Sequence, residues 1–122
     1  MPVSGCLNRV VLIGHVGSTP EVGATARGAR VATFRLATDR RTPDGESRQT
    51  DWHTVVAWDR LASEVERWVH RGDRVFVEGR IETRMTKGRR GVPREVTEIV
   101  AEELIPLGQR IGGQPVAGAA GE

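Results

Sequence analysis

The sequence predicts a small all-β domain with a single helix, and three patterns lead to this fold class. Five segments alternate apolar and polar side chains or are rich in β-branched residues, as strands with a buried face are. Glycine- and proline-containing segments between them mark turns. Only residues 59–72 place apolar side chains at helical spacing. The 122 residues are enough for one domain with its own core.

The first two principal strands are expected in residues 7–16 and 30–39. Residues 7–16 are rich in Val, Leu and Ile and stop at a Gly-Ser-Thr-Pro turn. A weaker extended segment, residues 21–28, follows and ends in a glycine turn. In residues 30–39 alternate side chains, Phe34 among them, are expected to face the core, which leaves Arg35 on the opposite face.

The third predicted strand carries the most informative residues of the chain. It follows a polar loop in which Pro43-Asp44-Gly45 predicts a tight turn, because proline presets φ and glycine accepts a positive φ. Alternation over residues 51–58 puts Trp52 and Trp58 on one face of the strand and His53 on the other. Two indoles on one strand face form either a heavy core or a platform on which bases stack.

Residues 59–72 are predicted to form the helix. The pattern consists of an N-cap at Asp59, apolar residues at Leu61, Val65, Trp68 and Val69, and a C′ glycine at Gly72. This spacing makes Trp68 a core residue, with a ligand contact as the alternative.

The last two strands are expected in residues 74–84 and 94–104. Val77 and Ile81 are among the side chains expected to face inward, because the first of these strands alternates clearly. Gly79 interrupts the alternation and predicts a bend or bulge of the kind that lets a small barrel close.

Five strands with a helix between the third and the fourth is the order of an OB-fold, a five-stranded, partly open Greek-key barrel. Residues 1–105 are expected to form this domain. Residues 106–122, mainly Gly, Ala, Pro and Gln, are expected to be a disordered tail. The strand faces and loops of OB-folds bind oligonucleotides, so nucleic acid is the first ligand class to consider.

Positive charge is concentrated in the expected last hairpin. Residues 84–94 contain five cations and no carboxylate, although the net charge of the whole chain is only +2. All of these cations except Lys87 are arginines, whose planar guanidinium groups suit phosphate recognition; a GC-rich genome would also favour arginine. The hairpin is either a solvated loop or, beside an aromatic strand, part of a surface for single-stranded nucleic acid.

Beyond these patterns, the chain resembles the bacterial single-stranded DNA-binding protein (SSB) over about residues 5–105. The matching stretches are residues 8–14 (NRVVLIG), 31–38 (VATFRLAT), 50–57 (TDWHTVVA), 61–62 (LA), 72–79 (GDRVFVEG) and 97–100 (TEIV). The resemblance implies an OB-fold, sequence-independent binding and protection of single-stranded DNA in replication, recombination or repair, and a homotetramer.

The resemblance also implies roles for individual residues. Trp52 and Trp58 fall where the family has base-stacking aromatics, and His53 falls at a position on the interface between subunits. The expected DNA-binding residues are Trp52, Trp58, Arg9, Arg35, Arg41, Arg71, Arg84, Met85, Lys87, Arg89, Arg90 and Arg94. Cys6 is the only cysteine, so an internal disulfide is excluded. It is either an inert thiol or a partner for its symmetry mate at a subunit interface.

The chain departs from the family in three places. Arg40-Arg41-Thr42 stands where the family has a further stacking tryptophan, and Met85 or Thr86 stands where its last hairpin has another. With two platform aromatics, binding is expected to depend more on salt-sensitive phosphate contacts. The sequence ends Ala-Ala-Gly-Glu, without the acidic tip that recruits replication proteins in the family, so recruitment by that route is not expected. A tail-less paralogue and a truncated chain would both end this way.

No catalytic constellation is visible in the sequence. The three histidines are scattered, and neither a phosphate-cradling glycine loop nor a carboxylate cluster with metal-site spacing occurs, so we expect no enzyme and no cofactor. No apolar run approaches the ~18 residues of a membrane span, so we expect a cytoplasmic, nucleoid-associated protein without a membrane partner. The alternative to single-stranded DNA binding is an OB-fold adaptor of replication or recombination that acts mainly through protein contacts.

Overall fold

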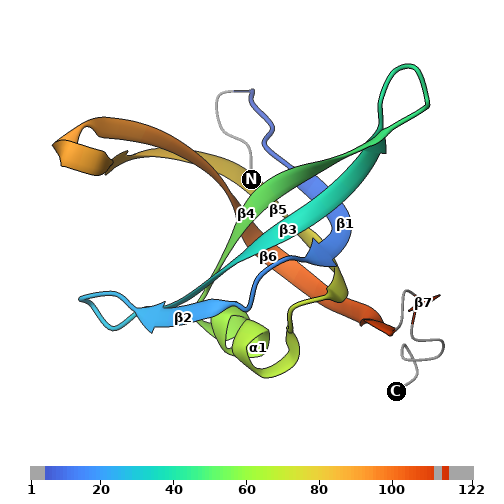
Figure 1. Cartoon of the computed structure of the whole chain (residues 1–122). Coiled ribbons are helices and arrows are strands. Elements are labelled where there is room, and N and C mark those ends of the chain that lie inside the picture. Colours follow the sequence, from blue (N-terminus) through green and yellow to red (C-terminus); the bar gives the residue numbers. More distant parts are fainter. Residues whose placement is uncertain (1–4, 112–113, 116–122) are drawn as a thin grey trace.

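The computed structural model describes residues 5–111 and 114–115, which form a closed β-barrel with one helix packed against it. The elements are β1 (Val10–Val16), β2 (Glu21–Ala24), β3 (Arg30–Arg41), β4 (Arg48–Trp58), α1 (Arg60–Trp68), β5 (Asp73–Lys87), the 3₁₀ turn η1 (Arg89–Gly91), β6 (Pro93–Ile111) and β7 (Gln114–Pro115). The barrel closes in the order β1-β5-β6-β4-β3, with β3 returning to β1, and β2 extends the sheet beyond β3. This five-stranded barrel, with α1 between its third and fourth strands, confirms the predicted OB-fold (Figure 1).

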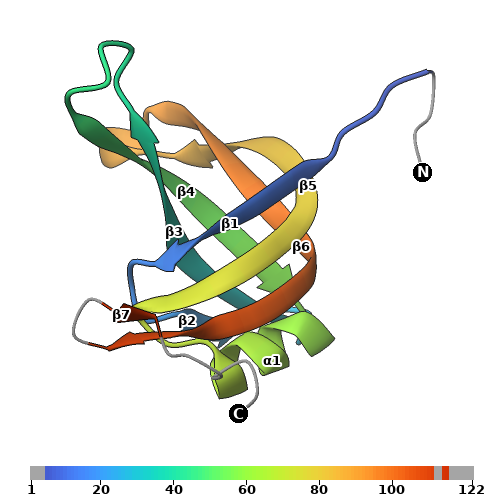
Figure 2. The ribbon, with the colours of Figure 1, turned by 90° about the vertical axis from the view of Figure 1, so that its right-hand side faces the viewer.

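Barrel closure depends on a short contact between β1 and β3. His15 pairs with Ala37 and Val16 pairs with Leu36. Gly14 permits this close approach, because a Cβ atom there would lie 2.3 Å from the carbonyl oxygen of Ala37. Figure 2 shows the resulting barrel with β1, β5 and β6 side by side and α1 across one end.

Alternate residues of the barrel strands and one face of α1 make the core. Its largest fully buried side chains are Phe34, Leu36, Val55, Val65, Val75 and Val77. Each such burial is worth about 1.5–3 kcal/mol relative to exposure. The expected inward positions of β3 and β4 are confirmed. Ile81, also expected inward, lines a hollow at the open end of the barrel and is 45% exposed there.

A bulge lies at the predicted place, opposite Gly79 of β5, with its extra residue, Glu102, on β6. The register of β5 against β6 shifts between Glu78 and Gly79. A Cβ atom at Gly79 would lie 2.0 Å from the carbonyl oxygen of Val100, so a side chain at this position would push the two strands apart. Such bulges increase strand twist, which helps a small sheet to close on itself.

Helix α1 is shorter than the sequence predicted, and its ends differ from the expected caps. The helix ends at Trp68 with Val69 as its C-cap, so the prediction of Gly72 as the C′ residue is wrong. Gly72 instead has φ +93° in the following turn and donates its N–H to the carbonyl oxygen of Val16 at 2.7 Å. Asp59 holds the N-cap position without a side-chain hydrogen bond, because its φ of 54° lies outside the extended region that capping side chains use.

The prediction that Trp68 belongs to the core is also wrong, since this residue is 56% exposed. The space beneath α1 is filled by Ala62, Val65 and Val69, which are buried. Trp68 lies about 90° around the helix from the middle of that face. Its ring is covered in part by Arg67, whose guanidinium carbon is 5.1 Å from the ring centroid.

Strand β6 continues past the predicted end of the domain. It runs to Ile111, and its pairing with β5 reaches Asp73↔Gln109. Residues 106–111, which were expected to begin a disordered tail, therefore extend the barrel wall. The rest of the predicted tail lies outside the described residues, apart from Gln114 and Pro115 in β7.

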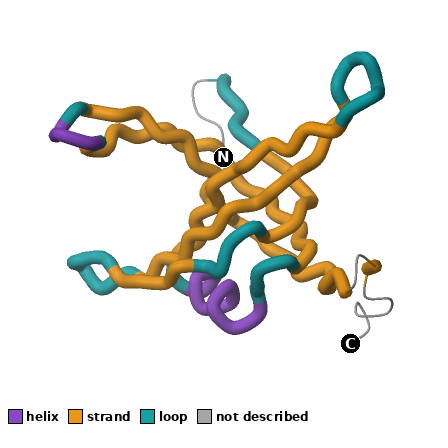
Figure 3. The backbone as a smooth tube through the Cα atoms, viewed as in Figure 1, coloured by secondary structure: helices purple, strands orange, loops and turns teal. Residues whose placement is uncertain are grey.

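Two long hairpins extend from the barrel in different directions. Strands β3 and β4 stay paired as far as Arg41↔Arg48, and the turn beyond them has Gly45 at φ +76°, as the Pro-Asp-Gly sequence predicted. Strands β5 and β6 stay paired as far as Lys87↔Pro93, with η1 at the tip. The backbone trace shows both hairpins as arms reaching well beyond the body of the barrel (Figure 3).

Candidate nucleic-acid interface

The outward face of β4 carries two exposed indoles. Trp52 and Trp58 are 50% and 41% exposed, whereas Val55 and Ala57 on the inward face are fully buried. The predicted alternation is therefore confirmed for these four residues, whereas Val56, predicted on the same face as the tryptophans, is buried. The two tryptophans are separated by about 20 Å along an extended strand. This outward face of β4, with the rings of Trp52 and Trp58, is termed the stacking platform. The same strand anchors the core through its inward side chains.

Two neighbours fix the ring of Trp52. The guanidinium carbon of Arg35 on the adjacent strand lies 4.9 Å from the ring centroid, a cation–π arrangement. A Cβ atom at Gly17 would lie 2.1 Å from Cζ3 of Trp52, so the ring packs directly over a glycine backbone. Arg35, an expected DNA-binding residue, thus lies on β3 directly beside the stacking platform.

Two of the expected phosphate-binding arginines are already paired with carboxylates. Arg84 donates Nε and Nη2 to the two carboxylate oxygens of Glu98, at 3.1 and 3.0 Å. These hydrogen bonds to Glu98 raise the pKa of the Arg84 guanidinium above its ordinary value. Arg9 donates Nε to Glu78 at 2.7 Å. The acid-free run of residues 84–94 therefore overstates the charge that Arg84 offers to a ligand.

The tip of the β5–β6 hairpin carries exposed cations without such partners. These tip cations are Lys87, Arg89, Arg90 and Arg94. Within residues 5–111, none of them forms an ion pair. Met85, the remaining expected contact on this hairpin, is 62% exposed. The structure therefore gathers one aromatic surface and one cationic hairpin on strands that are neighbours in the barrel.

Arg41 and Arg71 do not belong to β4, the strand that carries the two indoles of the stacking platform. Arg41 is at the end of β3 in the β3–β4 hairpin, where its Nη1 donates to the carbonyl oxygen of Gly45 at 3.3 Å. Arg71 follows α1 and lines a hollow with Thr19 and Pro20. A role in DNA binding for either residue stays a prediction.

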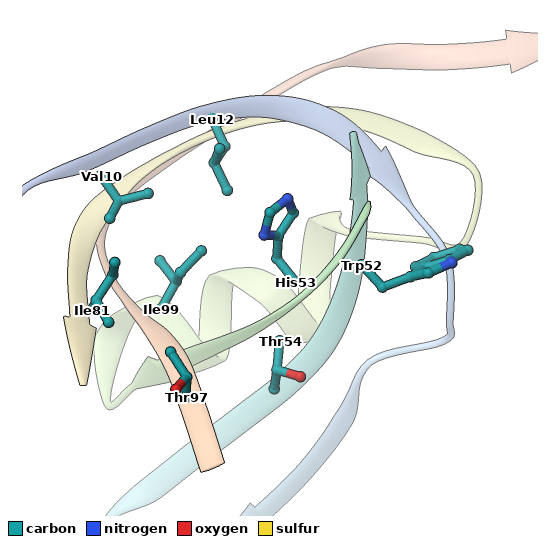
Figure 4. A pocket seen from close by; sticks show the side chains of 8 residues that line it. All are labelled: Val10, Leu12, Trp52, His53, Thr54, Ile81, Thr97 and Ile99. Carbon is teal, nitrogen blue, oxygen red and sulfur yellow. The ribbon is translucent and has the colours of Figure 1, made fainter. Parts of the chain in front are cut away.

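His53 lies on the inward face of β4, in a hollow at the open end of the barrel. The hollow has a volume of about 320 Å³ and is lined by Val10, Leu12, Trp52, His53, Thr54, Ile81, Thr97 and Ile99. His53 points into it, across β4 from Trp52, and its Nε2 lies 2.9 Å from Oγ1 of Thr38 (Figure 4). Cys6 is exposed in the segment before β1. Interface roles for His53 and Cys6 stay predictions.

A second apolar surface on the outside of the barrel was not anticipated from the sequence. It consists of Val11 and Ile13 on β1, Phe76 on β5 and Ile105 on β6, and is termed the outer apolar face. Ile13 pairs with Phe76 and Phe76 pairs with Ile105, so their side chains share one side of the sheet. Val11, Ile13 and Ile105 are 51%, 49% and 43% exposed. The signal was present in residues 10–13, which are apolar at every position, because such a strand has two faces to bury.

No group of three or more His, Cys, Asp or Glu side chains in residues 5–111 is arranged to hold a metal ion. The helix in this part of the chain is too short and too polar to cross a membrane.

Comparisons with known proteins agree with this geometry. Residues 7–107 match the model of the single-strand binding protein family. A single-stranded DNA-binding protein of Bacteroides thetaiotaomicron is 40% identical over 118 residues, which cover 93% of this chain and 73% of that protein. Single-stranded DNA-binding protein 1 of Chlorobaculum tepidum is 38% identical over 111 residues, covering 88% of this chain and 68% of that protein.

A solved structure, the Plasmodium falciparum SSB in complex with single-stranded DNA, superposes with a TM-score of 0.77 at 33% identity. The match covers 87% of this chain and 99% of that chain. Together with the platform, the cationic hairpin and the five-stranded barrel, these matches establish that the chain belongs to the single-strand binding protein family.

Proposed function

We propose that this protein binds single-stranded DNA without regard to base sequence, through base stacking on Trp52 and Trp58 and phosphate contacts from the tip cations. The observation that carries the proposal is the pair of half-exposed indoles on the outward face of a strand whose inward face is core. A rigid strand presents the rings at little entropic cost, and every base has a π-face that can stack on them. Such stacking requires no readout of base edges, so it does not select a sequence.

The same geometry favours single strands over duplex DNA. Paired bases already stack on one another inside the double helix, so they cannot reach the rings of Trp52 and Trp58. A bound single strand is in turn held away from its complement and from nucleases. We propose that this protection serves replication, recombination or repair, in the cytoplasm at the nucleoid.

We further propose that the protein acts as a homotetramer, in which a second copy covers the outer apolar face. Four large side chains on three adjacent strands form this surface, and contiguous apolar patches of this kind mark interaction sites. Cys6, which is exposed just before β1, is a further residue that we expect at this interface. The expected interface role of His53 would need a separate contact at the hollow, because His53 points into it and away from the outer apolar face. A tetramer would let one DNA strand pass over several stacking platforms in succession.

Tryptophan fluorescence during titration with oligo(dT) tests the DNA-binding proposal. The wild type, Trp52→Ala and Trp58→Ala are compared at low and high salt. Quenching that each substitution largely removes, with affinity falling as salt rises, is the expected result. Each lost stack should weaken binding by about 1–3 kcal/mol. A folded wild type that shows no quenching at low salt would overturn the proposal.

The second candidate is an adaptor that works mainly through protein contacts. The two ion pairs Arg9–Glu78 and Arg84–Glu98 favour it, because they reduce the positive charge offered to DNA. The fluorescence titration separates the candidates, since an adaptor has no reason to show salt-dependent quenching by oligo(dT).

A further inference from the structure

Trp68 and Arg67 repeat, on the helix, the arrangement seen at Trp52 and Arg35. In each pair an arginine guanidinium lies over an exposed indole, at 5.1 Å for Arg67 and 4.9 Å for Arg35. Trp68 is 56% exposed, more than Trp52 at 50%. Smaller residues fill the core beneath the helix, so packing does not explain why an exposed tryptophan stands at position 68.

The charges around Trp68 favour an anionic partner. The two acidic residues of α1 are neutralised locally, since Glu64 accepts from Arg60 at 2.7 Å and Glu66 accepts from Arg30. Arg67 and Arg71, by contrast, form no ion pair within residues 5–111. The surface at the end of α1 thus combines a flat aromatic ring with unpaired guanidinium groups. Nucleic acid, with stacked bases and phosphates, complements both features, whereas a neutral protein partner would use only the ring.

Chain connectivity places this surface within reach of the stacking platform. Strand β4 ends at Trp58, and α1 begins two residues later at Arg60. The nine residues of the helix span about 14 Å. At about 3.4 Å per nucleotide of a stacked strand, roughly four nucleotides cover that length.

We propose that Trp68 and Arg67 form a third contact for single-stranded DNA, in which a base stacks on the indole and the guanidinium binds the adjacent phosphate. This inference rests on the proposed function and extends it from the β4 face to the end of α1. Long strands are expected to use the contact, while a short oligonucleotide that is held on the platform does not reach it.

A chain with Trp68 as its only tryptophan gives the most direct test. Trp52→Phe and Trp58→Phe are combined, because phenylalanine keeps a ring for stacking but does not contribute indole emission. Oligo(dT) of about 16 nucleotides, the upper site size for one OB-fold, is expected to quench the remaining emission and to shield it from acrylamide. Emission and acrylamide access that stay unchanged while this variant binds the oligonucleotide would overturn the proposal.

Affinity measurements on the otherwise native protein supply the second test. Trp68→Ala is expected to weaken binding of the same long oligo(dT) by about 5- to 150-fold, the effect of losing one base stack. Binding of an oligo(dT) of about four nucleotides, the lower site size, is expected to be unaffected. Trp68→Phe should restore most of the lost affinity, which a loss of folding would not explain.

Arg60 offers a matched control for Arg67 on the same helix. Arg67→Ala is expected to lower the slope of log K against log salt by about 0.7, the contribution of one phosphate contact on a single strand. Arg60→Ala should leave the slope unchanged, because its charge is already paired with Glu64.

Different results overturn the proposed function and the third contact. A wild type that does not bind oligo(dT) at all overturns the proposed function together with this inference. A wild type that binds oligo(dT), with Trp68→Ala and Arg67→Ala both indistinguishable from it at every length, overturns the third contact alone.

Discussion

The ring of Trp52 occupies the space that a side chain at Gly17 would need. A Cβ atom at Gly17 would lie 2.1 Å from Cζ3 and 2.7 Å from Cη2 of the indole, well inside van der Waals contact. The glycine follows β1 directly and its N–H donates to the carbonyl oxygen of Arg35 at 2.8 Å. Gly17 therefore sets the position of the ring on one side, while Arg35 covers it from the adjacent strand.

Gly17→Ala is predicted to weaken DNA binding without unfolding the protein. The added methyl group must displace the indole of Trp52, which is half exposed and can move into solvent. The loss in affinity for oligo(dT) should approach the ~1–3 kcal/mol of one base stack, with little change in the thermal midpoint. Gly23→Ala on β2 is the matched control, because a Cβ atom there meets nothing within 4 Å. Equal affinities for the two variants would contradict the role assigned to Gly17.

Glu98→Gln is predicted to strengthen DNA binding. The substitution removes the charge that Arg84 now faces and leaves its guanidinium available to a phosphate. Affinity at low salt should rise up to about fivefold, because an ion pair at the protein surface is worth ~0.2–1 kcal/mol. The salt slope should steepen by about 0.7, the value for one further phosphate contact.

Glu103→Gln is the control for that experiment. Glu103 is an exposed carboxylate on the same strand, β6, but unlike Glu98 it forms no ion pair within residues 5–111. It therefore reports the general effect of removing one negative charge. If both variants gain affinity to the same extent, the pairing of Arg84 with Glu98 does not limit binding.

Ile13→Asp is predicted to break the proposed homotetramer into smaller species. Ile13 lies on the outer apolar face beside Phe76, and a carboxylate buried there without a partner is costly. Because the residue is half exposed in one chain, the fold itself should tolerate the change. Sedimentation equilibrium measures the outcome. Val92→Asp at the β5–β6 hairpin, where Val92 is 60% exposed, should leave the oligomeric state unchanged.

Acid is predicted to loosen the turn of the β3–β4 hairpin. The carboxylate of Asp44 accepts hydrogen bonds from Oγ1 of Thr42 and from the Glu46 N–H, and these lower its pKa below the ordinary 3.8. A lowered pKa stabilises the turn above pH 3.8, and the contribution disappears as pH falls through the folded-state pKa. The chemical shift of the Glu46 amide in a pH titration follows this change. Asp44→Asn should abolish the transition.

The sequence predicted the faces of β3 and β4 correctly because side-chain direction in a strand has a fixed period of two. It could not predict that Glu98 lies beside Arg84, because that contact depends on the hairpin register of two strands. The bulge of β6 opposite Gly79 shifts this register by one position, and its effect on pairing could not be known from one glycine.

Trp68 was misplaced for a different reason. A residue seven positions after Leu61 returns to nearly the same side of a helix, so the spacing alone assigns both to the core. Leu61 is itself only half-buried, at the edge of the apolar stripe. The small cavity beneath a nine-residue helix is filled by Ala62, Val65 and Val69, and an indole beside Leu61 has no room in it.

Strand β4 lets stability and ligand recognition change independently during evolution. Its inward residues, Val55 and Ala57, are under selection for packing, while Trp52 and Trp58 face outward and leave the core untouched when they are replaced. Affinity for the proposed DNA ligand can therefore change when either tryptophan is replaced by another aromatic residue, without a compensating change in the interior. The same arrangement has one vulnerability: a slip of the strand by a single residue would exchange the two sets of side chains and destroy both properties together.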